Sequence, residues 1–444
     1  MEDFSSENGD LEVGVERTLI LDGVAHRGYA VGRDSGRVVF VRGGIPGEVV
    51  RVRITRRGPK GRFWYADTLR VLEASADRVV HPWPIAALAS DDDGAHPVTA
   101  PVGGLDLGHI SLAGGRHWKG EVVRDQLRKI GRLTWPEVVV EAAPGDEENS
   151  GLRWRTRVQL AVDAQGRAGM RPHRSHDVIA LDELPIAVPA IAQLDLFGRK
   201  WPPGAKLQIA LPSASAPFIA VNGQPWNPGK GASERGARRA SSAPQRRYVR
   251  EKVTAQVAGQ AVTAQFQVAG TGFWQVHRLA PQILAEAVLK AADVQVGEHV
   301  IDLYAGVGLF AKFLHAVIGP TGRITAIESD ANAMRAARRN FHAAKNVDLV
   351  TADVRHLARN DELPKGSVVV LDPPRAGAGA EVVRAIAARH PRKIVHVSCD
   401  PATFARDVRT YYELGWQMTE LRAFDLYPLT HHVETLGVFQ PVVS

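Results

Sequence analysis

Regular patterning in the sequence begins after residue 15, with short segments in which apolar and polar positions alternate. Four of them, RTLILDGV, GRVVFVRG, EVVRVRIT and FWYADTLRVL, lie within residues 16–75 and are separated by turns rich in glycine, proline and aspartate. A period of two is typical of β-strands that bury one face. We therefore expect an OB-like β-barrel over residues 16–75, preceded by a flexible acidic and polar tail at residues 1–15.

The middle of the chain, residues 76–270, has a weaker pattern. RHWKGEVVRDQLRKIG reads as a helix that ends at Gly131, whereas RTRVQLAVD and AVTAQFQVAG read as strands. Together these elements predict an α+β central domain. Within it, residues 223–250 are rich in glycine, serine, proline and arginine and show no periodicity, which predicts a basic disordered loop.

Strands alternate with helices from residue 271 to residue 444. The strand segments are HVIDLY, RITAIE, VDLVTAD, SVVVLD and KIVHVS, and helical segments such as LFAKFLHAV and ANAMRAARRNFHAA lie between them. This alternation predicts an α/β, Rossmann-like, doubly wound parallel sheet, with a terminal hairpin formed by GWQMTELRAFDLYP and HVETLGVF. In such sheets the ligand binds at the carboxyl ends of the strands.

The composition is that of a multidomain globular protein, with 444 residues, 45% of them hydrophobic and 23% charged. The single cysteine, Cys399, excludes an internal disulfide and any cysteine-rich zinc or iron–sulfur site, and we predict no metal. The start of the chain lacks the basic end and apolar stretch of a secretory signal. Because no segment has the run of about 18 apolar residues that a membrane span needs, we expect a cytoplasmic protein without a membrane partner.

A net charge of +7 points to a polyanionic partner. Basic residues without an intervening acid precede Phe63, Trp64 and Tyr65: Arg51, Arg53, Arg56, Arg57, Lys60 and Arg62. Cations beside aromatic faces suit a nucleic-acid backbone and its bases, although a charged barrel edge over a core of aromatics has the same pattern. The loop at residues 223–250 could also contact RNA phosphates, or it could be a solvated insertion.

A glycine-rich turn, with Gly306 and Gly308, joins the strand HVIDLY to a helix, where the backbone can approach a ligand closely. This turn alone leaves NAD open, because the nucleotide fingerprint tolerates Ala311 at its third glycine position. Acidic residues then follow at successive strand ends: Asp302, Glu328, Asp353 and Asp372. Carboxylates in these places suit the amine, ribose and adenine of S-adenosyl-L-methionine, although each alone could cap a helix.

Cys399 follows the strand KIVHVS and precedes Asp400 and Pro401, a helix cap and a residue suited to a first helical turn. The helix N-terminus is expected to favour the thiolate, whereas a lone cysteine is more commonly a buried structural residue. A thiolate beside a methyl donor suits methylation at carbon 5 of a pyrimidine, because addition at carbon 6 makes carbon 5 nucleophilic. Glu434, in the terminal segment THHVET, is the candidate base for the hydrogen at carbon 5.

The motifs GFWQV, DLYAGVGLF, DPPR, SCDP and HHVET together resemble the RNA 5-methyluridine methyltransferases, and GRVVFVRGGIPGEVV resembles their TRAM domain. The resemblance covers nearly the whole chain. It implies transfer of a methyl group from S-adenosyl-L-methionine to uracil in RNA, with Cys399 as nucleophile and Glu434 as proton acceptor. It also implies that Gln275, Tyr304, Glu328 and Asp372 bind the cofactor.

Many ribosomal-RNA members of that family carry four cysteines that hold an iron–sulfur cluster. Here the corresponding stretch runs from Val102 to His109, and His96 and Leu184 take the other two positions. We therefore expect no iron–sulfur cluster, and the RNA target of the cluster-bearing members does not transfer directly.

We expect the RNA target to be 23S rRNA before tRNA, and we predict no obligate protein partner. Amino-group methylation is disfavoured because Arg375 follows Asp-Pro-Pro where an aromatic residue is usual, and cytosine methylation in RNA usually uses two cysteines. The alternatives kept open are a tRNA-directed uracil-5 methyltransferase and an RNA-binding protein with an inactive methyltransferase domain.

Overall fold

The structure is a computed structural model that describes residues 13–88, 101–172, 175–226 and 247–442. Its internal contacts divide the chain into one unit of residues 1–118 with 429–431, and a second unit of residues 119–428 with 432–444. The division falls within helix α1 (Leu112–Gln126). Most of the expected tail, His96, and residues 227–246 of the expected basic loop lie outside the described residues.

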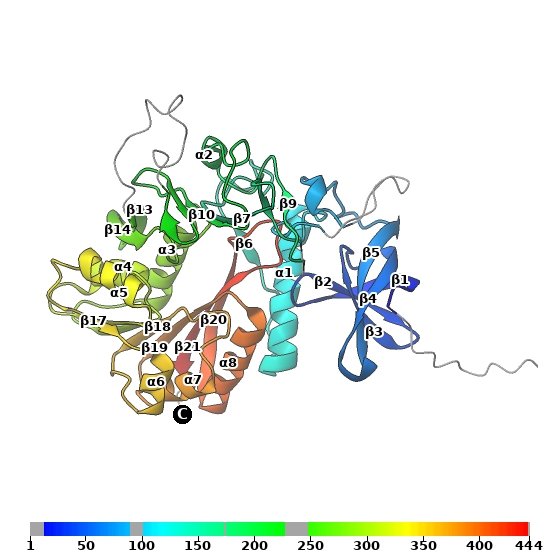
Figure 1. Cartoon of the computed structure of the whole chain (residues 1–444). Coiled ribbons are helices and arrows are strands. Elements are labelled where there is room, and N and C mark those ends of the chain that lie inside the picture. The colour runs from blue at the N-terminus through cyan, green and yellow to red at the C-terminus, as the bar shows by residue number, and fades with distance from the viewer. Residues whose placement is uncertain (1–12, 89–100, 173–174, 227–246, 443–444) are drawn as a thin grey trace, which may run out of the picture. The chain divides into compact units, whose positions relative to one another are not determined.

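The first unit contains the predicted β-barrel (Figure 1). Its strands are β1 (Glu16–Ala25), β2 (Tyr29–Asp34), β3 (Arg37–Arg42), β4 (Val49–Arg57) and β5 (Phe63–Glu73), which close in the order β1-β2-β3-β5-β4. Pairing is antiparallel except between β3 and β5, which run parallel. Two short 3-10 turns, Pro59–Gly61 and Pro84–Ala86, lie outside the barrel strands.

Strand alternation determines which aromatic residues fill the barrel. Trp64 is buried with Val39, Val41 and Ile54, whereas its chain neighbours on β5 are only partly buried. One aromatic residue therefore lies in the core, as the structural reading of the sequence expects, and its two neighbours lie on the outer face, so whether they bind RNA stays a prediction.

The second unit holds two smaller β structures. A six-stranded sheet has the order β12-β11-β10-β7-β8-β9. The short helix α2 (Pro189–Ala192) lies between β9 and β10 along the chain. Its strands are β7 (Arg157–Val162), β8 (Ala168–Met170), β9 (Ile179–Ala180), β10 (Lys206–Ala210), β11 (Phe218–Val221) and β12 (Gln224–Pro225). A long antiparallel hairpin follows, formed by β13 (Tyr248–Val257) and β14 (Gln260–Ala269).

The larger sheet of the second unit has eight strands in the order β17-β16-β15-β18-β19-β21-β20-β6. Its strands are β15 (His299–Leu303), β16 (Arg323–Glu328), β17 (Val347–Thr351), β18 (Val368–Leu371), β19 (Lys393–Ser398), β20 (Trp416–Asp425), β21 (Glu434–Pro441) and β6 (Val140–Ala142). The first five strands of this order run parallel, and β20 and β21 form the predicted terminal hairpin. The doubly wound arrangement is therefore confirmed.

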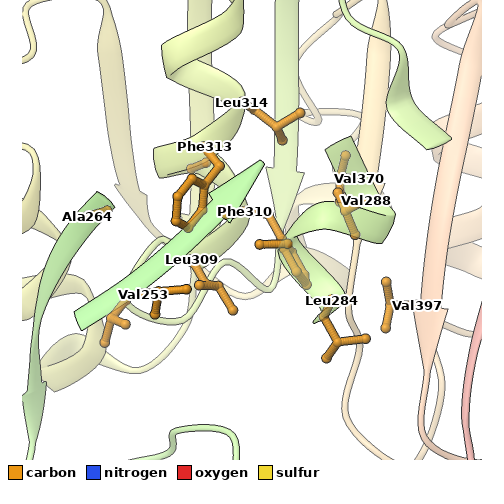
Figure 2. Packing of buried hydrophobic residues seen from close by; sticks show 14 of the residues in the cluster. Val253, Ala264, Leu284, Val288, Leu309, Phe310, Phe313, Leu314, Val370 and Val397 are labelled. Atoms are coloured by element: carbon orange, nitrogen blue, oxygen red, sulfur yellow. The ribbon is translucent and has the colours of Figure 1, made fainter. Parts of the chain in front are cut away.

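Helices cover both faces of this sheet (Figure 1). They are α3 (Ala280–Ala292), α4 (Leu309–Ile318), α5 (Ala331–Asn340), α6 (Val354–Arg359), α7 (Ala380–Ala387) and α8 (Pro401–Glu413), and a π-helical turn, Leu127–Gly131, continues α1. On one face, α3, α4 and the β13–β14 hairpin share a core with alternate sheet residues, as Figure 2 shows for Leu284, Phe313 and Val370. Helices α7 and α8 pack on the opposite face.

Two elements from the range expected as the central domain pack with the large sheet. Strand β6 pairs with β20 in parallel, Val140 opposite Ala423, and the β13–β14 hairpin contributes Val253 and Phe266 to the core of α3 and α4. None of the helices in the described part of the chain combines the length and the apolar character that a membrane span requires.

Candidate active site

Cys399 lies at the carboxyl end of β19, directly before helix α8. As predicted, Asp400 caps this helix, and its Oδ1 accepts hydrogen bonds from the backbone N–H groups of Ala402 (3.1 Å) and Thr403 (2.9 Å). Pro401 occupies the first helical turn, where its missing N–H costs no hydrogen bond. The Cys399 side chain is partly exposed, so a ligand can reach it.

Glu434 is the first residue of strand β21, and the pairing of β21 with β19 brings it near Cys399. Ser398 lies opposite Thr435 in the antiparallel pair of β19 and β21, and the Thr435 hydroxyl donates to the Ser398 carbonyl at 3.0 Å. The next residues along this register are Cys399 and Glu434, and the charge of Glu434 acts on the Cys399 thiol. The Glu434 side chain is only 4% exposed. The two residues chosen from the sequence as catalytic are therefore brought together, although 34 residues separate them.

Tyr427 is a third side chain at this position. Its hydroxyl donates a hydrogen bond to Oε1 of Glu434 at 3.3 Å. The backbone before it is fixed by Lys119 of α1, whose Nζ donates to Asp425 at 2.5 Å and to the Tyr427 carbonyl at 3.0 Å. Lys119 and Asp425 are both buried, so the pair holds the end of β20 in place.

The loop after β18 carries Asp372 and Arg375 and is held by one side of helix α8. The Thr403 hydroxyl donates to the Arg375 carbonyl at 3.2 Å. Buried Asp407 accepts hydrogen bonds from the backbone N–H groups of Ala378 (2.9 Å) and Gly379 (3.1 Å). The helix that begins beside Cys399 thereby fixes the segment that carries the second acidic group of the site.

The glycine turn between β15 and α4 leaves open space for a ligand. Gly306 and Gly308 both have positive φ, +57° and +90°. A Cβ at Gly306 would meet no atom within 4 Å, whereas one at Gly308 would collide with the ring of Phe341. Tyr304, before the turn, also has positive φ (62°), which is uncommon for a tyrosine.

The acidic residues at the strand ends play different parts. Oδ2 of buried Asp302 accepts from the Ala311 N–H at 3.0 Å, but its Oδ1 has no hydrogen-bond partner among the described residues. Glu328 accepts from the Gly306 N–H at 3.0 Å and thus ties β16 to the glycine turn. Asp353 is exposed and caps α6, accepting from the N–H of Arg355 at 2.8 Å. Capping, one of the two readings of the sequence, therefore describes what Asp353 does here.

Burial and mutual repulsion raise the pKa values of the carboxyl groups near Cys399. Burial raises the pKa of Asp372 to about 7. Burial and the charge of Asp372 raise the pKa of Glu434 to about 8, against the opposing effects of Tyr427 and Arg375. Burial, with Asp372 and Glu328 adding, also raises the pKa of Asp302 to about 8. Three carboxyl groups of the site therefore titrate near neutral pH.

The environment of Cys399 acts against the thiolate that the sequence led us to expect. Burial raises the pKa of the thiol to about 12, and the charges of Glu434 and Asp372 raise it further than Arg375 lowers it. The physical reason is that burial, together with two nearby acidic groups, outweighs the field of the helix N-terminus, whose first N–H groups already bond to Asp400. The resting thiol is therefore protonated at neutral pH.

The residues present fit S-adenosyl-L-methionine, a ligand with positive charge and hydroxyl groups. The unpartnered Oδ1 of Asp302 is a buried acceptor, the hydroxyl of Tyr304 is buried near Arg355, and Gly306 has free space above it. Carboxylates with raised pKa values gain from a nearby cation. Of the predicted cofactor residues, Tyr304, Gly306, Glu328, Asp353 and Asp372 lie at the strand ends. Gln275 is buried between β14 and α3, and the described residues give no hydrogen bond from it to these groups.

Two residues of the site escaped the sequence reasoning. Tyr427 stands in FDLYP, a segment that reads only as a strand end. Arg155 comes from the central segment, where its Nε donates to the Arg157 carbonyl at 2.9 Å. Burial lowers the pKa of Arg155, and the charges of Tyr427 and Arg375 also act on it, so the guanidinium lies within electrostatic reach of both. In the sequence, only the basic segment RWRTR around Arg155 could have indicated that this residue belongs to the site.

No group of three histidine, cysteine, aspartate or glutamate side chains suited to a metal occurs among the residues that the structure describes. Of the positions aligned with cluster cysteines, Val102 and Leu184 are both buried apolar residues within their own units. His96, another of these positions, lies outside the described residues.

A parallel sheet with a glycine turn and acidic residues at its carboxyl edge defines the class of S-adenosyl-L-methionine-dependent methyltransferases. Residues 238–441 match the family described as tRNA (Uracil-5-)-methyltransferase, and residues 10–60 match the TRAM domain. The chain belongs to the RNA (uracil-5-)-methyltransferase family, with an N-terminal TRAM domain. The resemblance seen in the sequence is thereby confirmed.

Relatives match over nearly their full length. A protein of Streptomyces avermitilis named as an uncharacterized RNA methyltransferase is 34% identical over 97% of this chain and 100% of its own. One of Bifidobacterium longum with the same description is 35% identical over 96% of this chain and 98% of its own. The crystal structure of Pyrococcus abyssi tRNA (uracil-54, C5)-methyltransferase with S-adenosyl-L-homocysteine has a TM-score of 0.65, 21% identity, and coverage of 95% and 100%, and it shows the common fold.

Proposed function

We propose that this protein methylates carbon 5 of a uridine in RNA through a covalent adduct with Cys399. The observation that carries the proposal is the register of β19 and β21, which sets Glu434 opposite Cys399 at the sheet edge that also holds Asp372 and the Gly306 turn. A nucleophile, a base and a place for a methyl donor are the groups that this chemistry needs.

In the first step, the sulfur of Cys399 bonds to carbon 6 of uracil. The electron pair of the C5–C6 double bond moves toward the C4 carbonyl, which becomes an enolate, and Arg375 and Arg155 supply positive charge nearby. The thiol proton passes to Asp372, whose pKa of about 7 suits proton uptake near neutral pH, and Glu434 stays ionised for the later proton removal.

In the second step, carbon 5 takes the methyl group, which the bound cofactor supplies as an electrophile. Glu434 then removes the hydrogen at carbon 5. The electrons of that C–H bond restore the C5–C6 double bond, the bond from carbon 6 to sulfur breaks, and the thiolate recovers its proton. The net products are 5-methyluridine, S-adenosyl-L-homocysteine as the leaving group of the methyl transfer, and one proton, so no oxidant or reductant is needed.

The cofactor residues of the proposal are Gln275, Tyr304, Gly306, Glu328, Asp353 and Asp372. Asp302, the buried carboxyl group with an unpartnered oxygen, joins this group. Residues 16–75 then act as the RNA-binding barrel, residues 76–270 as the central domain and residues 271–444 as the methyltransferase domain, all in the cytoplasm and without an obligate protein partner.

Covalent trapping tests the mechanism. RNA that contains 5-fluorouridine should form an adduct stable to denaturing electrophoresis in the presence of S-adenosyl-L-methionine, because fluorine cannot leave as a proton. Cys399→Ala should form none. Because the chain has one cysteine, no other thiol can substitute. An adduct that persists in Cys399→Ala would refute the mechanism, and a wild-type protein that binds RNA but forms no adduct would favour the inactive, RNA-binding alternative.

The RNA target can be identified by mapping 5-methyluridine in 23S rRNA and tRNA from cells with and without the gene. We propose 23S rRNA, so one ribosomal uridine should lose its methyl group on deletion and regain it with the wild-type gene but not with Cys399→Ala. Loss confined to tRNA would instead assign the tRNA-directed activity.

A further inference from the structure

Four aromatic side chains gather on the outer face of the barrel in the first unit. They come from three neighbouring strands: Tyr29 on β2, Phe40 on β3, and Phe63 and Tyr65 on β5. Each is only partly buried, while the residues that alternate with them, such as Ala30, Val39 and Trp64, fill the barrel. We call these four residues the aromatic patch. Apolar groups held at a surface commonly mark a binding site.

Strand pairing holds the aromatic patch together. Phe40 lies directly beside Tyr65 in the parallel pair of β3 and β5. Their ring centres are 5.5 Å apart, the Tyr29 and Tyr65 centres 5.3 Å, and the Phe40 and Phe63 centres 5.4 Å. Most of these contacts are edge to face, so the rings support one another and leave part of their faces to solvent. The rings are therefore held in place before any ligand arrives.

Positive charge adjoins the aromatic patch. The guanidinium of Arg56 stacks on Tyr65, 3.8 Å from its ring centre, and has no carboxylate partner among the described residues. Phe63 lies against Gly58, the residue before the turn that carries the exposed side chains of Lys60 and Arg62. In contrast, Arg51 and Arg53 form ion pairs with Glu16 at 2.8 and 2.9 Å. The basic run seen in the sequence is thus divided, and its unneutralised part adjoins the rings.

Bases that are free to unstack fit this surface better than a duplex does. A base can stack on a ring face that is open or on the Arg56 guanidinium that covers Tyr65, and the adjoining cations can contact phosphates along the same strand. Rings arranged along a barrel face cannot reach bases that remain paired inside an A-form helix. A protein partner would meet the same rings but would gain less from Arg56, Lys60 and Arg62.

We propose that the aromatic patch, with Arg56, is a stacking platform that binds unpaired bases of the RNA substrate. This inference rests on the proposed function only for the identity of the RNA. It assigns separate parts to the residues of the barrel: Trp64 stabilises the fold, Glu16 neutralises Arg51 and Arg53, and the four outer rings bind bases.

Binding of labelled RNA by the full-length protein tests the platform. The probes are a single-stranded oligonucleotide and the same sequence in a duplex, measured by fluorescence anisotropy at one fixed salt concentration. Phe40→Leu and Tyr65→Leu keep apolar bulk but remove the flat ring. Each should weaken single-strand binding about tenfold, and wild type should prefer the single strand to the duplex. Ile20→Ala, an exposed residue of β1, is the matched control and should bind as wild type does.

The outcomes separate this proposal from the proposed function. Cys399→Ala should lose the fluorouridine adduct and retain RNA affinity, whereas the patch variants should lose affinity. If wild type binds the single strand through the patch but forms no adduct, the mechanism fails and the platform stands. Folded Phe40→Leu and Tyr65→Leu variants with wild-type affinity would overturn the platform, as would equal affinity for the duplex. A dimer in sedimentation that these substitutions dissociate would also overturn it, in favour of a protein partner.

Discussion

The hydroxyl of Tyr427 donates a hydrogen bond of 3.3 Å to Oε1 of Glu434, the carboxyl group opposite Cys399. This bond favours the ionised carboxylate, because a donor stabilises the charged form. Burial and Asp372 act in the opposite direction and raise the pKa of Glu434 to about 8. The pKa of the proposed base is therefore set by opposing effects, and the hydrogen bond from Tyr427 lowers it.

Tyr427→Phe should raise the pKa of Glu434 further, since the donor is lost while burial and Asp372 remain. The acidic limb of the pH–rate profile for methyl transfer should then move up by about half to one pH unit, with the larger loss of rate below pH 8. Tyr248→Phe, in the β13–β14 hairpin, is the control and should keep the wild-type profile. An unshifted profile in Tyr427→Phe would show that this bond does not set the ionisation of the base.

Glu434→Gln separates the two halves of the reaction. The amide can fill the same space but cannot accept the proton from carbon 5, so the Cys399 adduct should accumulate on ordinary RNA. The same substitution removes a charge that raises the pKa of the Cys399 thiol. Alkylation of the free protein by iodoacetamide at pH 8 should therefore become about three to ten times faster. Glu420→Gln, on strand β20, is the control; normal turnover in Glu434→Gln would require another base.

The sequence could predict the elements and the contacts made within each motif. Alternation located the barrel strands, the strand-and-helix order located the parallel sheet, and Asp400 with Pro401 located the start of α8 correctly. These features depend on residues close together along the chain. The same holds for the acidic residues, because each follows its own strand.

Features that depend on distant segments could not be predicted in this way. The bond from Tyr427 to Glu434 follows from hairpin geometry, and the approach of Arg155 depends on how the central segment folds back. Strand β6 joins the large sheet through only three residues, too few to give a pattern. The predicted direction of the Cys399 pKa shift was wrong, because the shift depends on burial of the thiol and on acidic groups from two other strands.

Asp302 should reduce the stability of the cofactor-free protein progressively as pH rises above about 4. Its folded pKa of about 8 is far above the ordinary value of 3.8, so the folded state favours the protonated form. The resulting penalty is absent below pH 4, accumulates as pH rises from 4 to 8, and is constant above that. Asp302→Asn keeps an acceptor for the Ala311 N–H and removes the charge. In urea unfolding it should gain about 1 to 3 kcal/mol at pH 8.5 and little at pH 4.

Asp348→Asn is the control for that measurement, because the side chain of Asp348 is 45% exposed and pairs with Arg323. It should show no gain at pH 8.5. A gain in Asp302→Asn that is equal at both pH values would mean that packing, and not ionisation, caused it.

Gly306→Ala tests where the cofactor lies. The left-handed φ of Gly306 costs alanine about 1 kcal/mol, but its Cβ would meet no protein atom within 4 Å, so the variant should fold. That Cβ would project into the space proposed for the cofactor. Affinity for S-adenosyl-L-homocysteine, measured by calorimetry, should fall about tenfold or more, while the melting temperature changes by only a few degrees.

Two other glycines make this result specific. Gly36 has a similar φ of +82° and open space around it in the barrel, so Gly36→Ala should carry the same backbone cost and leave cofactor affinity unchanged. Gly308→Ala should lose several kcal/mol of stability, because its Cβ would collide with the Phe341 ring. If Gly306→Ala binds S-adenosyl-L-homocysteine as tightly as Gly36→Ala does, the turn before α4 is not part of the cofactor-binding site. A loss confined to Gly306→Ala would instead place the ligand against the backbone of that turn.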